Sequence, residues 1–209
     1  MIQEVVKNIY RFTLSEFYTN NYCFIKNGKV LIIDSTESKP IINFIKEKKL
    51  KVAGLILTHG HVDHICGAKS FQQFNIIPLM NKNDDIQIKI SQSIYQEYGF
   101  EEEPLFNYQH IEEGKLKIDE FEIEVIETPG HTEGSISLLI DGILFSGDTL
   151  FKGSIGRTDL IGGCLNQILK SIKNKLLVLP NDTIVLPGHG EKTTIGEEKL
   201  NNPFIKEVI

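Results

Sequence analysis

The chain has 209 residues, a length that suggests one domain or two very small ones, and we expect a single domain over residues 1–209 with a core that needs no disulfides. Its apolar fraction of 41% and its charged fraction of 24% are ordinary for a globular protein. The net charge of −6 argues against nucleic acid or an anionic membrane surface as the main partner.

The sequence contains no run of the roughly 20 apolar residues that a membrane-spanning helix needs. Its first residues, MIQEVVKNIYRF, interleave charged and apolar side chains and lack the hydrophobic centre of a signal peptide. The three cysteines, Cys23, Cys66 and Cys164, are scattered and odd in number, which favours free, reduced thiols. We therefore expect a cytoplasmic protein.

Eight apolar runs rich in β-branched and aromatic residues predict strands. They span Val5–Thr13, Tyr22–Ile25, Val30–Ile33, Gly54–Leu57, Phe121–Ile126, Ile136–Ile140, Ile143–Phe145 and Ile184–Leu186. Asn27-Gly28 and Asp141-Gly142 each separate two of these runs. Both pairs accept the positive φ angles of a tight turn, so they predict hairpins.

Four segments between the strands show helical patterns, namely Pro40–Lys48, Asp63–Phe71, Asp84–Tyr98 and Gly163–Lys173. Ser38 and Asp63 are placed to cap the first two helices. The stretch Gly99–Tyr108, with three consecutive glutamates, predicts a solvated loop. Helices and strands mixed along the whole chain indicate α/β architecture.

Five of the six histidines lie in three short segments, and each segment directly follows a predicted strand. The segments are THGHVDH at residues 58–64, TPGH at 128–131 and PGHG at 187–190, and Asp148 ends a fourth strand in the same way. Strands that present residues at their carboxyl ends bring them to one edge of a sheet. His110 lies outside these segments and is interpreted as an ordinary surface or core residue.

These side chains are metal ligands by type, because imidazole and carboxylate together suit zinc, iron or manganese. His59 and His61, two residues apart in an extended turn, can face one metal. Asp63 and His64 begin the next helix and can face a second. The carboxylate of Asp148 has two oxygens and can bridge both ions. We expect two divalent metal ions per chain, with zinc favoured over iron and manganese.

Four motifs together resemble the metallo-β-lactamase superfamily: THGHVDH, TPGHTEGS, GDTLF and PGHG. Within it, GSIGRTDL after GDTLF and the final PGHGEKTTIGEEKLNNPF are similar to the short glyoxalase II-like hydrolases, which resemble hydroxyacylglutathione hydrolase. The resemblance implies a four-layer αββα sandwich with a metal site at one edge of the sheets. It also implies the ligand sets, with His59, His61 and His131 on the first metal, Asp63, His64 and His189 on the second, and Asp148 between them.

The resemblance further implies a small-molecule substrate, a thioester such as an S-acylglutathione or a related ester. A hydroxide that bridges the metals would attack the carbonyl carbon. Asp63 would act both as a ligand and as the catalytic group that orients this hydroxide. Class B β-lactamases usually carry a cysteine where this chain has Asp148, which argues against antibiotic hydrolysis.

Arg157 lies in the segment that follows Asp148 and is a candidate for binding a substrate carboxylate, because its guanidinium is a rigid bidentate donor. Lys152 is a second candidate in the same segment. The alternative for Arg157 is an internal salt bridge, for example to Asp159, that supports the loop.

Two rival functions remain open at this point. Persulfide dioxygenases share the HxHxDH motif and a segment like GRTD, but they use a single iron, which here would be held by His59, His131 and Asp148. The late histidine, His189, favours a second metal and so argues against this rival. The other rival is a non-catalytic metal-binding protein of the same fold.

Overall fold

The structure is a computed structural model that describes residues 1–206. Contacts divide the chain into two compact units. The first unit comprises Met1–Ile111 and Lys117–Phe121, and the second comprises Glu112–Leu116 and the chain from Glu122 onward. Each unit has a large sheet and helices of its own, and the single domain predicted for residues 1–209 stays a prediction.

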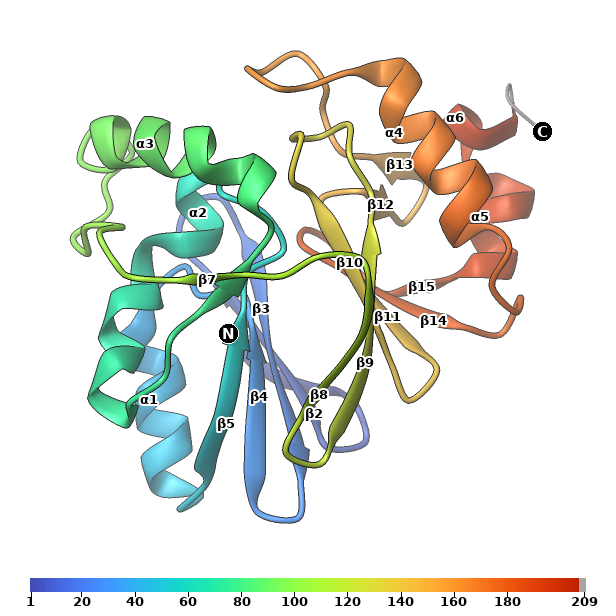
Figure 1. The fold of residues 1–209 in the computed structure, drawn as a ribbon. Helices are drawn as coiled ribbons and strands as arrows, with labels where there is room; N and C mark the ends of the chain where they lie inside the picture. The colour runs from blue at the N-terminus through green and yellow to red at the C-terminus, as the bar shows by residue number, and fades with distance from the viewer. Residues whose placement is uncertain (207–209) are drawn as a thin grey trace. The chain divides into compact units, whose positions relative to one another are not determined.

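The first unit contains a seven-stranded sheet in the order β1-β2-β3-β4-β5-β6-β7 (Figure 1). Strands β1 to β4 pair antiparallel, whereas β4, β5, β6 and β7 run parallel to one another. The strands are β1 (Ile2–Val6), β2 (Ile9–Leu14), β3 (Thr19–Lys26), β4 (Lys29–Ile33), β5 (Lys51–Ile56), β6 (Leu79–Met80) and β7 (Gln109–His110). The carboxyl ends of β4 and β5 therefore lie at the same edge of this sheet.

Helices pack on one face of the first sheet. They are α1 (Ser38–Glu47), α2 (Val62–Ile65), the 3-10 helices η1 (Cys66–Phe74) and η2 (Lys82–Asp84), and α3 (Asp85–Ile94). The apolar stripe of α1 puts Ile41, Phe44 and Ile45 into one cluster with Ile32 of β4 and Leu55 of β5. Val30 and Ile32 of β4 belong to this cluster, whereas Leu31 and Ile33, on the opposite face of the strand, are buried as well, so β4 is covered on both faces.

The second unit contains a six-stranded sheet in the order β15-β14-β11-β10-β9-β8 and a small ribbon of β12 and β13. The strands are β8 (Gly114–Ile118), β9 (Phe121–Glu127), β10 (Ile136–Ile140), β11 (Ile143–Gly147), β12 (Leu150–Phe151), β13 (Ser154–Ile155), β14 (Ile184–Pro187) and β15 (Thr193–Thr194). Strands β11 and β14 pair parallel, so their carboxyl ends meet at one edge.

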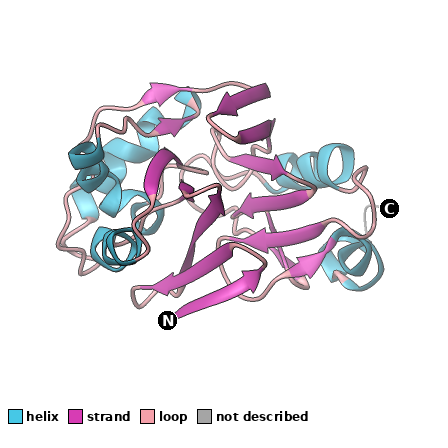
Figure 2. Ribbon diagram, turned by 90° about the horizontal axis from the view of Figure 1, so that it is seen from below, coloured by secondary structure: helices cyan, strands magenta, loops and turns pink. Residues whose placement is uncertain are grey.

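Three helices and one π turn pack on this second sheet: α4 (Leu165–Ser171), the π turn η3 (Ile172–Leu176), α5 (Ile195–Asn201) and α6 (Pro203–Lys206). Ile168 of α4 and Ile195 of α5 share a buried cluster with Leu144 and Val185. Strands and helices both contribute to the chain (Figure 2), so the predicted mixed α/β class is confirmed. No helix within residues 1–206 is long and apolar enough to span a membrane.

Both predicted hairpins are confirmed. Asn27 and Gly28 have φ of 49° and 75°, and Asp141 and Gly142 have φ of 51° and 75°. The run Val5–Thr13 is wrong as a single strand. It is split into β1 and β2 by a turn at Asn8, whose φ is 64°. An asparagine inside an apolar run was the available signal for this turn, because asparagine tolerates positive φ better than most residues.

Both predicted helix caps are also wrong. The N-cap of α1 is Glu37 and that of α2 is His61, and neither makes a capping hydrogen bond through its side chain. The N-terminus of α1 is instead satisfied by Glu102, which lies 64 residues further along the chain. Its Oε1 accepts from the Ser38 N–H at 2.8 Å and from Ser38 Oγ at 2.9 Å.

The loop Gly99–Tyr108 is only partly solvated, because Phe100 and Phe106 are buried. Glu102, in the middle of this loop, also accepts from Ser70 Oγ at 2.7 Å through its second oxygen. One carboxylate thus joins the loop to α1 and η1. A carboxylate near a helix N-terminus is further favoured by the helix dipole.

We expect Glu102→Ala to lower the free energy of unfolding by about 1–3 kcal/mol, because three donors lose a charged acceptor. Urea denaturation monitored by circular dichroism measures the change. Glu101→Ala is the matched control, since the neighbouring side chain is exposed, and its effect should stay within about 0.5 kcal/mol. Equal losses in the two variants would contradict the capping role of Glu102.

Candidate metal centre

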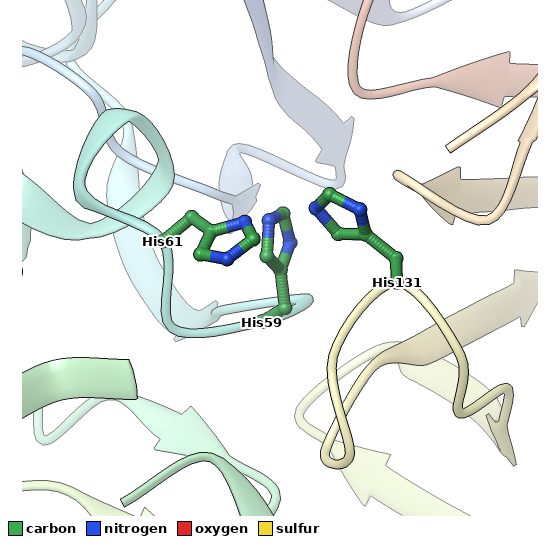
Figure 3. Close-up of side chains that lie close together, drawn as sticks. All are labelled: His59, His61 and His131. Atoms are coloured by element: carbon green, nitrogen blue, oxygen red, sulfur yellow. The ribbon is translucent and has the colours of Figure 1, made fainter. Parts of the chain in front are cut away.

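The first unit presents four potential metal ligands directly after β5. His59 and His61 lie in the connection from β5 to α2, and Asp63 and His64 lie in α2 itself. The ring centroid of His59 is 4.8 Å from that of His61 and 4.1 Å from that of His64. Figure 3 shows the His59 and His61 rings close together on this connection. The predicted strand-end placement is therefore confirmed within this unit.

Glycine is required between the two histidines of this connection. A Cβ on Gly60 would lie 2.8 Å from Cβ of Gln87 and 3.1 Å from the carbonyl oxygen of Asp84. The backbone is held in that tight position from both sides, since the Gly60 N–H donates to Asp84 Oδ2 at 2.7 Å and Ser91 Oγ donates to the Gly60 carbonyl at 2.8 Å. The connection is thus anchored to α3.

A buried carboxylate that the sequence analysis missed, Asp34, organises these ligands. It follows β4, and its Oδ2 lies 2.8 Å from His64 Nδ1. Both side chains are buried, at 2% and 0% exposure. The carboxylate accepts, so Nδ1 carries the proton and Nε2 is the nitrogen of His64 that can bind a metal. Asp34 could have been found from its position at a strand end, which it shares with Asp148.

Asp34 reaches a second histidine through Thr58. The Thr58 N–H and hydroxyl donate to the two Asp34 oxygens at 2.7 and 2.8 Å. Because the hydroxyl has a single proton, it can only accept from His59 Nδ1, which lies 3.1 Å away. His59 therefore also presents Nε2 as a potential ligand.

The second unit contributes His131, Asp148 and His189, which follow β9, β11 and β14. Asp148 Oδ2 lies 3.5 Å from His131 Nε2 and 3.4 Å from His189 Nε2. The Nδ1 of His131 donates to the Arg157 carbonyl at 2.8 Å, which leaves Nε2 to face the carboxylate. Two imidazoles thus converge on one carboxylate oxygen within this unit.

A glycine precedes His131 for a steric reason. Gly130 has a φ of 137°, and a Cβ there would lie 2.2 Å from the backbone nitrogen of Ile168 in α4. Any side chain would push the His131 loop (Figure 3) away from α4. The glycine of TPGH is therefore explained by packing within the second unit.

The donor set suits zinc, iron or manganese, because it combines imidazole nitrogens with carboxylate oxygens. Thiolates contribute nothing to it. Cys23 and Cys66 are free and buried, and burial raises the pKa of both thiols, so both stay protonated. His110 is not part of either ligand set, since it is exposed beside Asp85, with His110 Nε2 and Asp85 Oδ1 3.3 Å apart.

Both candidate substrate-binding residues pair with acids. Arg157 donates through Nε and Nη2 to the two Asp159 oxygens at 2.8 and 2.7 Å, and this pairing lowers the pKa of Asp159 to about 2. Lys152 Nζ donates to Glu191 Oε2 at 2.7 Å. The internal salt bridge expected as the alternative for Arg157 is present, and a substrate role for either residue stays a prediction. All four side chains are exposed, so the pairs can exchange partners at little cost.

The two sheets with their helices and the two His/Asp ligand sets define a metal-binding α/β protein. Over residues 14–189 the chain matches the family model of the metallo-beta-lactamase superfamily, and it belongs to that family. The predicted family and fold class are therefore confirmed.

Individual relatives agree with this assignment. Hydroxyacylglutathione hydrolase GloC of Haemophilus influenzae is 37% identical, with 86% of this chain and 88% of that protein covered. The crystal structure of the BLEG-1 B3 metallo-beta-lactamase has a TM-score of 0.85 at 33% identity, covering 94% of this chain and 99% of that one. TTHA1623 in a di-iron-bound form has a TM-score of 0.84 at 29% identity, covering 93% and 98%. These relatives support a metal-dependent hydrolase as the general class.

We expect Asp34→Asn to weaken metal binding about 10- to 100-fold, because the uncharged amide has one accepting oxygen in place of two and cannot accept from His64 and both Thr58 donors as the carboxylate does. Competition with a metal chelator at fixed pH measures the affinity, and circular dichroism checks that the variant is folded. Asp119→Asn is the control, since Asp119 is a surface residue paired with Lys29 at 3.3 Å. An unchanged affinity in Asp34→Asn would show that the carboxylate does not orient a ligand.

Proposed function

We propose that the protein is a binuclear metal-dependent hydrolase of thioesters of the S-acylglutathione type. His59, His61 and His131 hold the first metal in this proposal, and Asp63, His64 and His189 hold the second. Asp148 would be the ligand common to both. Zinc is the favoured metal, because it supplies Lewis acidity without a redox change.

The position of Asp148 carries the proposal. His131 and His189 are assigned to different metals, yet both present Nε2 within 3.5 Å of the same Asp148 oxygen. A carboxylate between ligands of two ions is the arrangement that a bridge requires, because closely spaced cations need an anion between them. The di-iron-bound form of TTHA1623 supports the count of two and also makes iron the first alternative to zinc.

The chain's own residues have distinct roles in the proposed reaction. When bound, two divalent ions supply Lewis acidity and make water nucleophilic near neutral pH. The Asp63 carboxylate orients the attacking water by accepting a hydrogen bond from it. The Nδ1 partners of His59, His64 and His131 keep these rings in one tautomer and one orientation throughout.

Substrate binding is assigned to the segment after Asp148. In this proposal Arg157 exchanges Asp159 for a substrate carboxylate. Its guanidinium is exposed and already donates two parallel hydrogen bonds to the Asp159 carboxylate, which is the geometry that a substrate carboxylate needs. Lys152 offers a second, less directional positive charge. The similarity to the hydroxyacylglutathione hydrolase GloC supports a thioester as the substrate. The similarity to the BLEG-1 B3 metallo-beta-lactamase favours a β-lactam as the second candidate.

The first prediction of this proposal concerns metal content. Protein dialysed against zinc should retain close to two equivalents per chain, and Asp148→Asn should weaken both sites together because the amide lacks the bridging charge. Elemental analysis after dialysis measures the content. Asp182→Asn, an exposed change in the same unit, should retain both equivalents. Loss of only one equivalent in Asp148→Asn would show that Asp148 is not a bridge.

The second prediction concerns the substrate. Zinc-loaded protein should cleave S-lactoylglutathione without oxygen and release free thiol, which a thiol reagent detects. His189→Ala should lower kcat/KM by orders of magnitude, because one proposed site loses a histidine. Arg157→Ala should raise KM mainly for thioesters that carry a carboxylate, whereas Asp159→Asn should not.

Three outcomes would contradict the thioesterase proposal, and each points to a different function. Cleavage of penicillins without cleavage of thioesters would make the protein a β-lactamase. Oxygen uptake with glutathione persulfide by iron-loaded protein, without zinc-dependent thiol release, would make it a persulfide dioxygenase. No turnover of any of these compounds at full metal occupancy would leave a non-catalytic metal-binding protein.

A further inference from the structure

The carboxylate of Asp63 is held by a hydroxyl from another part of the first unit. Thr19 Oγ1 donates to Asp63 Oδ2 at 2.7 Å. Thr19 begins β3 and is fully buried, whereas the Asp63 side chain retains 13% exposure. A hydrogen bond from a buried hydroxyl to an ionised carboxylate is stronger than one between neutral groups.

The backbone of Asp63 is held from the same side. Thr36, which follows β4, donates through Oγ1 to the Asp63 carbonyl oxygen. Asn21 of β3 joins the two threonines, since its Nδ2 donates to the Thr19 carbonyl at 3.1 Å and to Thr36 Oγ1 at 2.9 Å. Its Oδ1 accepts from the Thr36 N–H at 2.6 Å. We call Thr19, Asn21 and Thr36 the Asp63 bracket.

The bracket leaves the Asp63 side chain little freedom. Rotation of an aspartate carboxylate about its Cβ–Cγ bond is otherwise broad, because that torsion has no sharp staggered minima. The Thr19 hydroxyl fixes it by occupying one lone-pair direction of Oδ2. The same oxygen lies 3.5 Å from His64 Nε2, so the fixed orientation keeps the carboxylate beside its neighbouring candidate ligand.

We propose that Thr19 is a positioning residue, whose hydroxyl sets the orientation in which Asp63 binds metal and directs the attacking water. This inference rests on the proposed function of Asp63. Thr19 itself touches neither metal nor substrate in the proposal. Thr36 and Asn21 support it by fixing the backbone from which the Asp63 side chain extends.

The test compares Thr19→Val with Thr19→Ser. Valine keeps the shape of threonine and removes the hydroxyl, whereas serine keeps the hydroxyl and removes the methyl group. Thr19→Ala is a second variant without a hydroxyl, for use if the valine variant does not fold. Thr193→Val is the matched control, because Thr193 is also buried and donates to a carboxylate, Glu198 Oε1, at 2.6 Å.

Zinc affinity measured by chelator competition is the first readout, and it needs no turnover. We expect one of the two zinc equivalents, the one assigned to Asp63, to bind about 10-fold or more weakly in Thr19→Val, and to bind as in wild type in Thr19→Ser and Thr193→Val. The second readout is kinetic, and kcat should fall in Thr19→Val with KM little changed. Thermal unfolding separates these effects from a loss of stability.

Two results would overturn the positioning role. One is wild-type zinc affinity in Thr19→Val. The other is an equal loss of affinity in Thr19→Ser and Thr19→Val, which would assign the effect to the methyl group. Failure of the proposed function would appear differently, as a wild-type protein that binds zinc but cleaves no thioester, and the comparison of affinities would still decide the role of Thr19.

Discussion

The hydrogen bonds of the buried Asp34 carboxylate are the interactions on which the candidate ligands of the first unit depend. It accepts from His64 directly and from the main chain and hydroxyl of Thr58. It thereby ties the ends of β4 and β5 to α2 and sets the proton position on two imidazoles. A buried carboxylate is costly unless its oxygens are satisfied, and here three donors satisfy it. The same hydrogen bonds that offset the cost of burying this charge orient the two candidate ligands, His59 and His64.

In the second unit a histidine is held in the same tautomer, but by a different type of hydrogen-bond acceptor. The Nδ1 of His131 is held by a backbone carbonyl rather than by a carboxylate. His59, His64 and His131 thus share one tautomer, with Nδ1 protonated and Nε2 directed outward, although a hydroxyl, a carboxylate and a carbonyl serve as the three acceptors. The fold therefore fixes the orientation of these three imidazole rings by supplying an acceptor at each Nδ1, and the acceptor can be of any of the three types.

Local features of the sequence predicted much of this structure. Strand-end placement of the candidate ligands follows from apolar, β-branched runs that the ligand motifs directly follow, and the two hairpins follow from Asn-Gly and Asp-Gly. Both are short-range signals. Interactions between distant parts of the chain could not be predicted in this way. Glu102 satisfies the α1 N-terminus from 64 residues away, and Thr19 reaches Asp63 from 44 residues away. Only the tertiary fold brings such pairs together.

The sequence analysis missed the buried carboxylate of Asp34, and it wrongly predicted Ser38 as a helix cap. Asp34 directly follows a predicted strand, as Asp148 does, and could have been singled out by the same rule, but it lacks the GDTLF motif that drew attention to Asp148. Ser38 fits the local preference for an N-cap, and the preference misled because a charged acceptor arrives from a loop. Local propensity is a weak guide where a stronger tertiary partner competes.

The main chain and the side chain of residue 157 take part in two separate interactions, which affects how this protein can change in evolution. The group that holds His131 is the carbonyl of residue 157, and the group exposed beside Asp159 is its side chain. Every amino acid supplies the carbonyl, whereas only the side chain carries the charge. Mutation at this position can therefore alter the charge exposed beside Asp159 while the carbonyl that accepts from His131 stays in place. In the proposed function, this position can therefore change specificity without the loss of a candidate metal ligand.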